Sequence, residues 1–173
     1  MALSQNDCVM TSPEMGMVIA VAVYPVDAER LFRAFTEPAE ISHWWGGRRG
    51  GSRVTWRGQP EAGAGWRAEG HFARGQNFSA HGTFIEIERN TRFVQSWQGS
   101  WDGMLPTEVS ARFEQTAQGT VLSLVHRGFD GRDEARLAQA QIWWKVIKWL
   151  RLHFPDQIEN LDPLAEEGVE IGN

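Results

Sequence analysis

The chain has 173 residues, of which 42% are hydrophobic and 23% charged, and its formal net charge is −5. These values are typical of one globular domain of ordinary size, and the sequence holds no apolar run of about 18 residues that could span a membrane. Six acidic and no basic residues follow Pro155, so the rest of the chain is close to neutral. This balance argues against a nucleic-acid-binding surface.

Targeting and redox signals are weak in this sequence. The first residues lack the basic and apolar segments of a signal peptide, so we expect a cytoplasmic protein. Cys8 is the single cysteine, which excludes an internal disulfide. Residues 1–14 are polar and without periodicity, and we predict that they are disordered.

The first ordered elements are predicted to be a strand and two helices. Residues 15–23, MGMVIAVAV, form a β-branched run of strand length. Asp27 is a suitable N-cap for a helix whose apolar residues recur at helical spacing. Pro38 then opens a second short helix that runs to about His43. The following Trp-Trp-Gly-Gly run ends it, because glycine permits a left-handed exit.

Six further strands are predicted in the middle of the chain, separated by turns rich in Gly and Asn. In residues 65–72, Trp66, Ala68 and Phe72 share one face while charged residues occupy the other, as in a sheet with one wet face. The expected strands are SRVTWRG, GWRAEGHF, NFSAHGTFIEIE, TRFVQSW, TEVSARFEQ and TVLSLVHRG.

The last predicted element is a long helix from Glu134 to about His153, capped by Asp133 and stopped by Pro155. Its apolar stripe is unusually broad, which indicates a helix embraced by other elements. Strands joined by short loops form an antiparallel meander, and a strongly twisted sheet curls around whatever fills its concave face. We therefore predict an α+β helix-grip domain over residues 15–155, with a curved seven-stranded antiparallel sheet around the C-terminal helix. Residues 156–173 are predicted to form an acidic tail.

Four segments in this order resemble a known family. They are residues 23–47 with their Trp-Trp-Gly exit, EAGAGWRAEG (61–70), GTFIEIERNTRFVQSW (82–97) and TVLSLVHRGF (120–129). Together they are similar to the activator of heat-shock chaperone ATPase homologue-like family within the START-like, or SRPBCC, superfamily. The resemblance implies the helix-grip fold and a superfamily that includes lipid carriers, ligand receptors and polyketide cyclases. The eukaryotic activators carry a separate N-terminal chaperone-binding domain, and we expect this chain to be too short to include one.

The nine tryptophans predict either a dense core or an aromatic cavity between sheet and helix. Our first hypothesis is binding of a small hydrophobic or aromatic molecule in that cavity, without a cofactor. The alternative is that the bulky rings pack solidly and leave no space. The residues expected to contact the ligand are Trp66, Phe72, His81, Phe84, Trp97, Trp101, Met104, Phe113, Leu137, Trp144 and Ile147.

Two other functions remain open. A polyketide-cyclase-like or hydrolase-like enzyme would use His81 or His126 as the acid or base, and Glu69 and Glu108 are weaker candidates for the same role. A protein-interaction or chaperone-related module, or a homodimer, would use an exposed edge such as residues 15–23. The sequence shows no metal-ligand spacing, nucleophile elbow or phosphate-binding loop, so we predict no metal site and no catalytic set.

Overall fold

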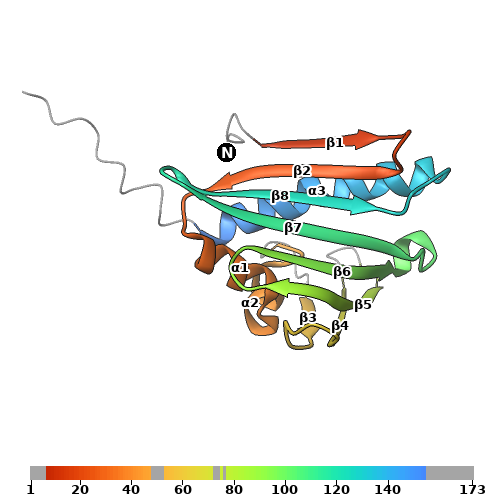
Figure 1. Cartoon of the computed structure of the whole chain (residues 1–173). Helices are drawn as coiled ribbons and strands as arrows, with labels where there is room; N and C mark the ends of the chain where they lie inside the picture. The colour runs from red at the N-terminus through yellow and green to blue at the C-terminus, as the bar shows by residue number, and fades with distance from the viewer. Residues whose placement is uncertain (1–6, 48–52, 72–74, 76, 155–173) are drawn as a thin grey trace, which may run out of the picture.

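The structure is a computed structural model that describes residues 7–47, 53–71, 75 and 77–154. Its strands form one antiparallel sheet in the order β1-β2-β8-β7-β6-β5-β4-β3 (Figure 1). The elements in chain order are β1 (Cys8–Ser12), β2 (Met17–Tyr24), α1 (Ala28–Thr36), α2 (Pro38–Trp44), β3 (Arg53–Arg57), β4 (Gly65–His71), β5 (Asn77–Glu88), β6 (Arg92–Gly99), the 3-10 turn η1 (Ser100–Asp102), β7 (Thr107–Thr116), β8 (Gly119–Arg127) and α3 (Asp133–His153).

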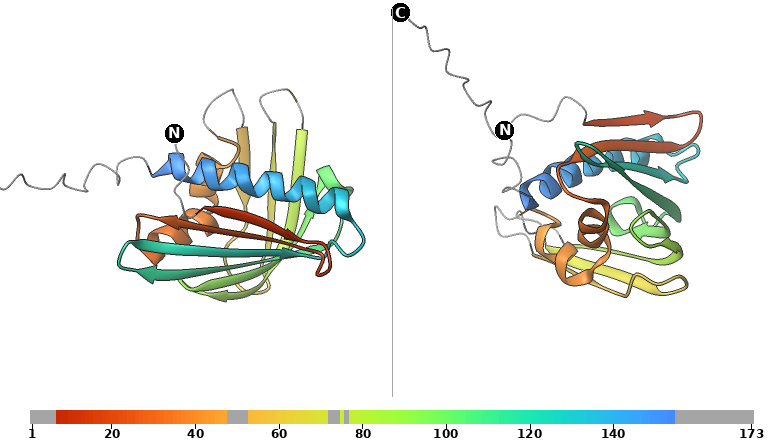
Figure 2. Two further views of the ribbon diagram at one scale, coloured as in Figure 1. Left: turned by 90° about the horizontal axis from the view of Figure 1, so that it is seen from above. Right: turned by 60° about the vertical axis from the view of Figure 1, so that its left-hand side comes forward.

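The sheet curls around α3, and the predicted helix-grip fold is confirmed. In Figure 2, β3, β4 and β5 run across the direction of β1, β2 and β8, while α3 lies along the concave side. Helices α1 and α2 close one end of the grip. Asp27 caps α1 as predicted, since its Oδ1 accepts from the backbone N–H of Arg30 at 2.7 Å.

The N-terminal prediction is wrong for residues 8–12. They form β1, an additional edge strand that pairs antiparallel with β2 from Cys8 opposite Val21 to Ser12 opposite Met17. Arg151 on α3 holds the start of this strand through a two-nitrogen ion pair with Asp7, in which Nε lies 3.0 Å from Oδ2. Backbone pairing and a buried carboxylate therefore order a segment that has no apolar periodicity. The acidic tail predicted for residues 156–173 lies outside the described residues.

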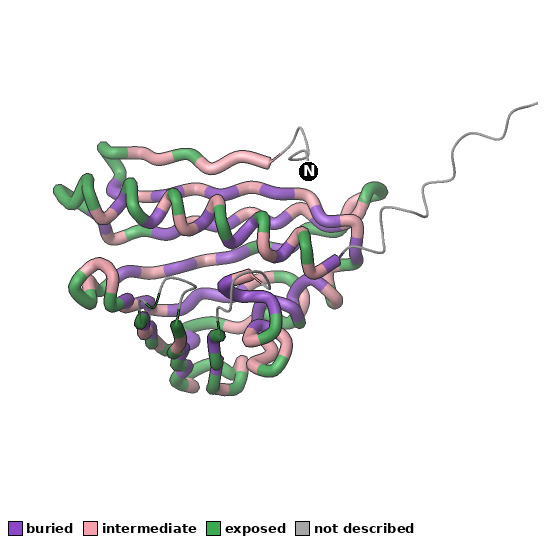
Figure 3. Tube along the Cα trace, turned by 180° about the vertical axis from the view of Figure 1, so that it is seen from behind, coloured by how far each residue is buried: buried purple, intermediate pink, exposed green. Residues whose placement is uncertain are grey.

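Alternation of buried and less buried residues along the strands sets the inner face of the sheet (Figure 3). On α3, the buried stripe consists of Arg136, Gln139, Trp143, Val146, Ile147 and Leu150. This stripe begins with two polar residues and leaves Leu137 half exposed. The helix begins at Asp133, and its N-cap position is Arg132, which makes no side-chain cap hydrogen bond, so the predicted cap at Asp133 is wrong.

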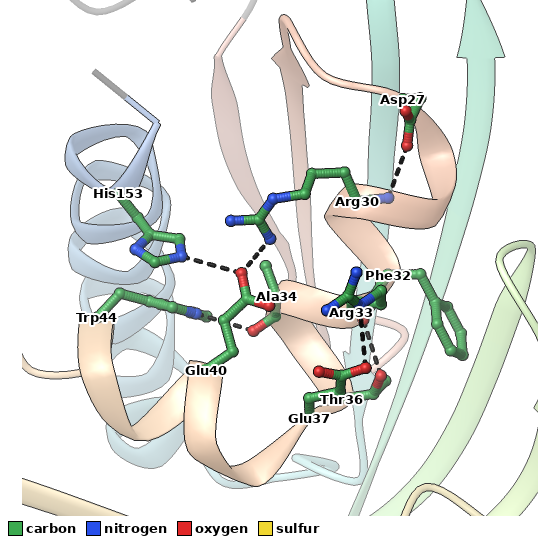
Figure 4. Close-up of polar contacts among 10 residues, drawn as sticks. All are labelled: Asp27, Arg30, Phe32, Arg33, Ala34, Thr36, Glu37, Glu40, Trp44 and His153. Atoms are coloured by element: carbon green, nitrogen blue, oxygen red, sulfur yellow. Dashed lines mark hydrogen bonds and ion pairs between the residues drawn. The ribbon is translucent and has the colours of Figure 1, made fainter. Parts of the chain in front are cut away.

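A polar cluster fastens the three helices at the closed end (Figure 4). Glu40 on α2 pairs with Arg30 on α1, and its Oε1 lies 3.0 Å from Nε2 of His153 at the end of α3. Beside it, the indole N–H of Trp44 donates to the carbonyl oxygen of Ala34 at 2.8 Å. These contacts fix α2 across this closed end of the grip, where it forms one wall of the interior cavity.

Candidate functional site

The interior cavity lies between α2, the inner face of β3–β6 and Trp143 on α3. Its volume is about 20 Å³, which is room for roughly one water molecule. Five tryptophans dominate its walls. The lining residues are Phe35, Thr36, Pro38, Ile41, Trp45, Trp56, Arg57, Gly58, Trp66, Phe84, Phe93, Gln95, Trp97, Val109 and Trp143.

The tryptophan rings pack as a continuous cluster. Trp56 and Trp66 are stacked, with centroids 4.9 Å apart, and Trp66 lies 4.7 Å from Trp97. Trp45 caps the cluster, with its ring 5.2 Å from Trp56. The register opposes Trp66 to Gly82, and a Cβ at position 82 would lie 2.7 Å from Nε1 of Trp66. The indole therefore lies flat on the sheet because residue 82 has no side chain.

Three of these indoles carry buried N–H groups without an acceptor among the described residues, namely Trp56, Trp66 and Trp97. A buried unsatisfied donor costs about 1–3 kcal/mol, and tryptophan N–H groups usually find a partner when buried. The three tryptophans with these unused donors all line the cavity, and an indole N–H recognises an oxygen acceptor. A ketone, ether or hydroxyl oxygen on an apolar molecule has this chemistry.

The structure brings only some of the expected ligand residues to this cavity. Trp66, Phe84 and Trp97 line it. Phe113 and Ile147 are buried in the surrounding core, and Trp144 is partly exposed. Phe72 lies outside the described residues.

Four expected residues are placed elsewhere, and each has a geometric reason. His81 is exposed because its neighbours Ala80 and Gly82 take the inner positions of β5. Leu137 is 51% exposed because the buried stripe of α3 passes through the neighbouring Arg136. Met104 is 37% exposed in the loop after η1, with a positive φ of 62°. Trp101 borders a separate surface groove beside α3.

Most lining residues were not predicted from the sequence, and the most notable of these are Trp45, Trp56, Gln95 and Trp143. The alternation of β3 contained a signal for Trp56, which shares a face with buried Val54. Trp143 was distinguishable from Trp144 only by the rotation of α3. That rotation depends on Arg136 and Gln139 facing inward, which hydrophobic patterning does not predict.

His126 is part of a closed hydrogen-bond chain and does not line the cavity. Thr107 donates its hydroxyl to the carbonyl oxygen of Trp97 at 2.8 Å, so its oxygen accepts from Nε2–H of His126 at 2.7 Å. Nδ1 accepts the indole N–H of Trp143 at 3.2 Å. Burial lowers the pKa of His126 to about 3, and both ring nitrogens are engaged in this neutral tautomer.

The acid–base residues expected for an enzyme therefore do not gather at the cavity. Neither His81 nor His126 lines it. Glu69 pairs with Arg67 at an exposed position of β4. Glu108 lies 3.6 Å from Arg127 and does not line the cavity, although its neighbour Val109 does. The histidine-based cyclase or hydrolase hypothesis has no support in this arrangement.

Two kinds of feature are absent from the described ranges. No three His, Cys, Asp or Glu side chains there are grouped so that they could hold a metal ion. No helix in the same part of the chain has both the length and the apolar character needed to cross a membrane.

Comparisons with known proteins identify the fold and a family. The family model described as Activator of Hsp90 ATPase homolog 1-like protein matches residues 25–154. No curated protein matches the chain.

Among solved structures, protein Ms6760 from Mycobacterium smegmatis is similar with a TM-score of 0.73 and 10% identity, over 86% of this chain and 96% of that one. A protein from Rhodobacter sphaeroides gives a TM-score of 0.72 and 18% identity, over 85% and 97%. DynU16, a protein of the dynemicin biosynthetic locus, gives 0.63 and 18%, over 80% and 46%. At these identities the similarity shows a shared fold.

Proposed function

Because this chain belongs to the family of Activator of Hsp90 ATPase homolog 1-like proteins, whose helix-grip fold fits ligand binding, we propose that it binds a small apolar or aromatic molecule. The ligand lies in the grip between the sheet and α3. The observation that carries this proposal is the trio of buried, unused indole N–H groups around one cavity. Aromatic rings supply the contact area, and the N–H groups supply acceptor recognition.

The small volume of the cavity means that a ligand larger than water must displace a tryptophan ring. Trp45 is the best candidate, because its ring contacts Trp56, Trp97 and Trp143 from the C-terminal end of α2. Gly46 follows it with a positive φ of 90°, a conformation that glycine adopts without strain. Withdrawal of Trp45 would join its own volume to the cavity and open a path beside α2.

A fold relative from a biosynthetic locus supports a small-molecule ligand over a macromolecular one. Protein interaction through an edge strand is less well supported. β1 carries the exposed Met10 at one edge of the sheet, but this edge is short.

Native mass spectrometry of the protein from its own source, combined with a thermal-shift screen of aromatic ketones, phenols and acids, tests the proposal. We expect an adduct mass or a stabilised unfolding midpoint for at least one aromatic class. Trp66→Phe retains the stacked ring but removes one N–H, so it should weaken carbonyl ligands by about 5–10-fold. No adduct and no stabilisation by any compound would overturn ligand binding.

A further inference from the structure

The inner stripe of α3 begins with two polar residues in a position where apolar ones are expected. Arg136 is 4% exposed and Gln139 is 1% exposed, and they lie one turn apart on the face that continues into Trp143. Charged residues are almost never fully buried unless they are paired. These two residues therefore require a specific explanation.

Neither residue uses its full hydrogen-bonding capacity within the described chain. Arg136 donates a hydrogen bond from Nη2 to Oδ1 of Asp133 at 2.8 Å, while its Nε and Nη1 have no acceptor. Gln139 accepts the indole N–H of Trp101 at 3.1 Å, while its Nε2 has no acceptor. A partly unpaired buried guanidinium is costly, so protein stability alone does not account for this arrangement.

A groove open to solvent lies directly beside these donors. Its volume is about 640 Å³, and its walls come from η1 and the first turns of α3. Two wall residues, Asp133 and Trp101, are the hydrogen-bond partners of Arg136 and Gln139. Arg136 and Gln139 do not line the groove themselves, but each is hydrogen-bonded to a residue that does.

Trp101 connects this groove to the tryptophan cluster. Its indole lies over Gly99, where a Cβ would be 2.6 Å from the ring, and its centroid is 6.2 Å from that of Trp97. Trp97 borders the interior cavity. A flat molecule in the grip could thus have its apolar end among the tryptophans and its polar end at Arg136.

The residues that line the groove include three acids and one base, so an anionic group would be held by Arg136 behind the wall. Three acids border the groove, but Asp133 and Glu134 are exposed, so water screens their charge. Arg136 is buried. The N-terminus of α3 adds little attraction, because Asp133 and Glu134 in its first turn already offset its partial positive charge. Asp102 is partly buried with one carboxylate oxygen unpartnered, and this oxygen can accept a ligand hydroxyl.

We propose that the ligand is an aromatic carboxylic acid whose carboxylate replaces Asp133 on Arg136 and accepts from the amide of Gln139. This inference rests on the proposed ligand-binding function and names the chemical class of the ligand. The exchange is inexpensive, because one carboxylate replaces another and the released Asp133 side chain is already 71% exposed.

The test compares 2-naphthoate with its neutral isostere 2-naphthamide by isothermal titration calorimetry. The proteins are the wild-type chain, Arg136→Met, Asp133→Asn and the control Arg89→Met, which removes an exposed arginine in the β5–β6 turn. Wild type should prefer the acid by at least about 10-fold. Arg136→Met should abolish this preference, Asp133→Asn should increase acid affinity several-fold, and Arg89→Met should behave as wild type.

The unfolding temperature separates ligand binding from a structural role of Arg136. If Arg136 serves the ligand, Arg136→Met should unfold at a temperature no lower than wild type, because the change removes a partly unpaired buried charge. A structural role would instead lower the unfolding temperature. Equal binding of acid and amide by wild type, or weaker acid binding by Asp133→Asn, would overturn the carboxylate assignment and leave ligand binding intact. If neither compound binds any of the four proteins, the carboxylate assignment falls, and the screen of aromatic ketones, phenols and acids decides the proposed function separately.

Discussion

Trp143 donates its indole N–H to Nδ1 of His126, 3.2 Å away. Because indole is only a donor, this contact fixes His126 as the tautomer protonated on Nε2. Thr107 and the carbonyl of Trp97 complete the chain. The histidine that sequence reasoning considered as a catalytic base thus joins α3 to β8, β7 and β6 as a neutral element of the core.

The first prediction concerns pH. The pKa of His126 is lowered to about 3 in the folded protein, against about 6.5 in the unfolded chain. Between these values the unfolded state binds one more proton than the folded state. The contribution of His126 is therefore fully present above about pH 6.5 and falls by about 1.4 kcal/mol per unit as the pH decreases toward 3.

Denaturant unfolding at several pH values between 4 and 6, with His126→Gln as the comparison, isolates this effect. The variant will be less stable overall, but its stability should depend less steeply on pH than that of wild type. Identical slopes for the two proteins would show that His126 is not the residue that carries the effect.

The second prediction concerns Thr107→Val. This change keeps the side-chain shape but removes the acceptor of His126 Nε2–H and the donor to the Trp97 carbonyl. We expect a loss of about 1–3 kcal/mol in the free energy of unfolding, measured in urea. Thr107→Ser retains the hydroxyl and serves as the matched control; a loss as large as that of valine would rule out the hydrogen bonds as the cause.

The third prediction concerns Trp97, which is 1% exposed and contacts four other tryptophans of the interior, namely Trp45, Trp56, Trp66 and Trp143. Trp97→Ala should lower the free energy of unfolding by about 3–5 kcal/mol. Trp101→Ala, at a partly exposed ring, should cost clearly less. A loss under about 1 kcal/mol for Trp97→Ala would mean that the ring borders empty space in solution.

The fourth prediction concerns Gly82. A Cβ there would clash with the carbonyl oxygen of Ser96 and press on the indole of Trp66, so Gly82→Ala should destabilise by about 1–3 kcal/mol. Gly65→Ala on the adjacent strand is the control, because the nearest atom to its added Cβ is 3.8 Å away. Gly65→Ala should have little effect in the same thermal unfolding experiment. Equal effects at both positions would show that the close approach is relieved in solution.

The fold class can be predicted without the structure, because the alternation in residues 65–72 and the broad apolar stripe near Trp143 are local patterns that each element displays alone. The cap at Asp27 was equally readable, since the capping hydrogen bond involves residues three apart. The alternation of side chains along the strands was enough to predict three cavity residues, namely Trp66, Phe84 and Trp97.

Tertiary structure alone decided the site. The rotation of α3 places Arg136 and Gln139 inward and Leu137 outward, because one turn of helix packs near Trp101 and the partner of Gln139 is 38 residues away. β1 became ordered through pairing with β2 and an ion pair that spans 144 residues. Long-range hydrogen bonds leave no periodic trace in the sequence, so the groove, the buried donors behind it and the small volume of the cavity appear only when the sheet curls around the helix.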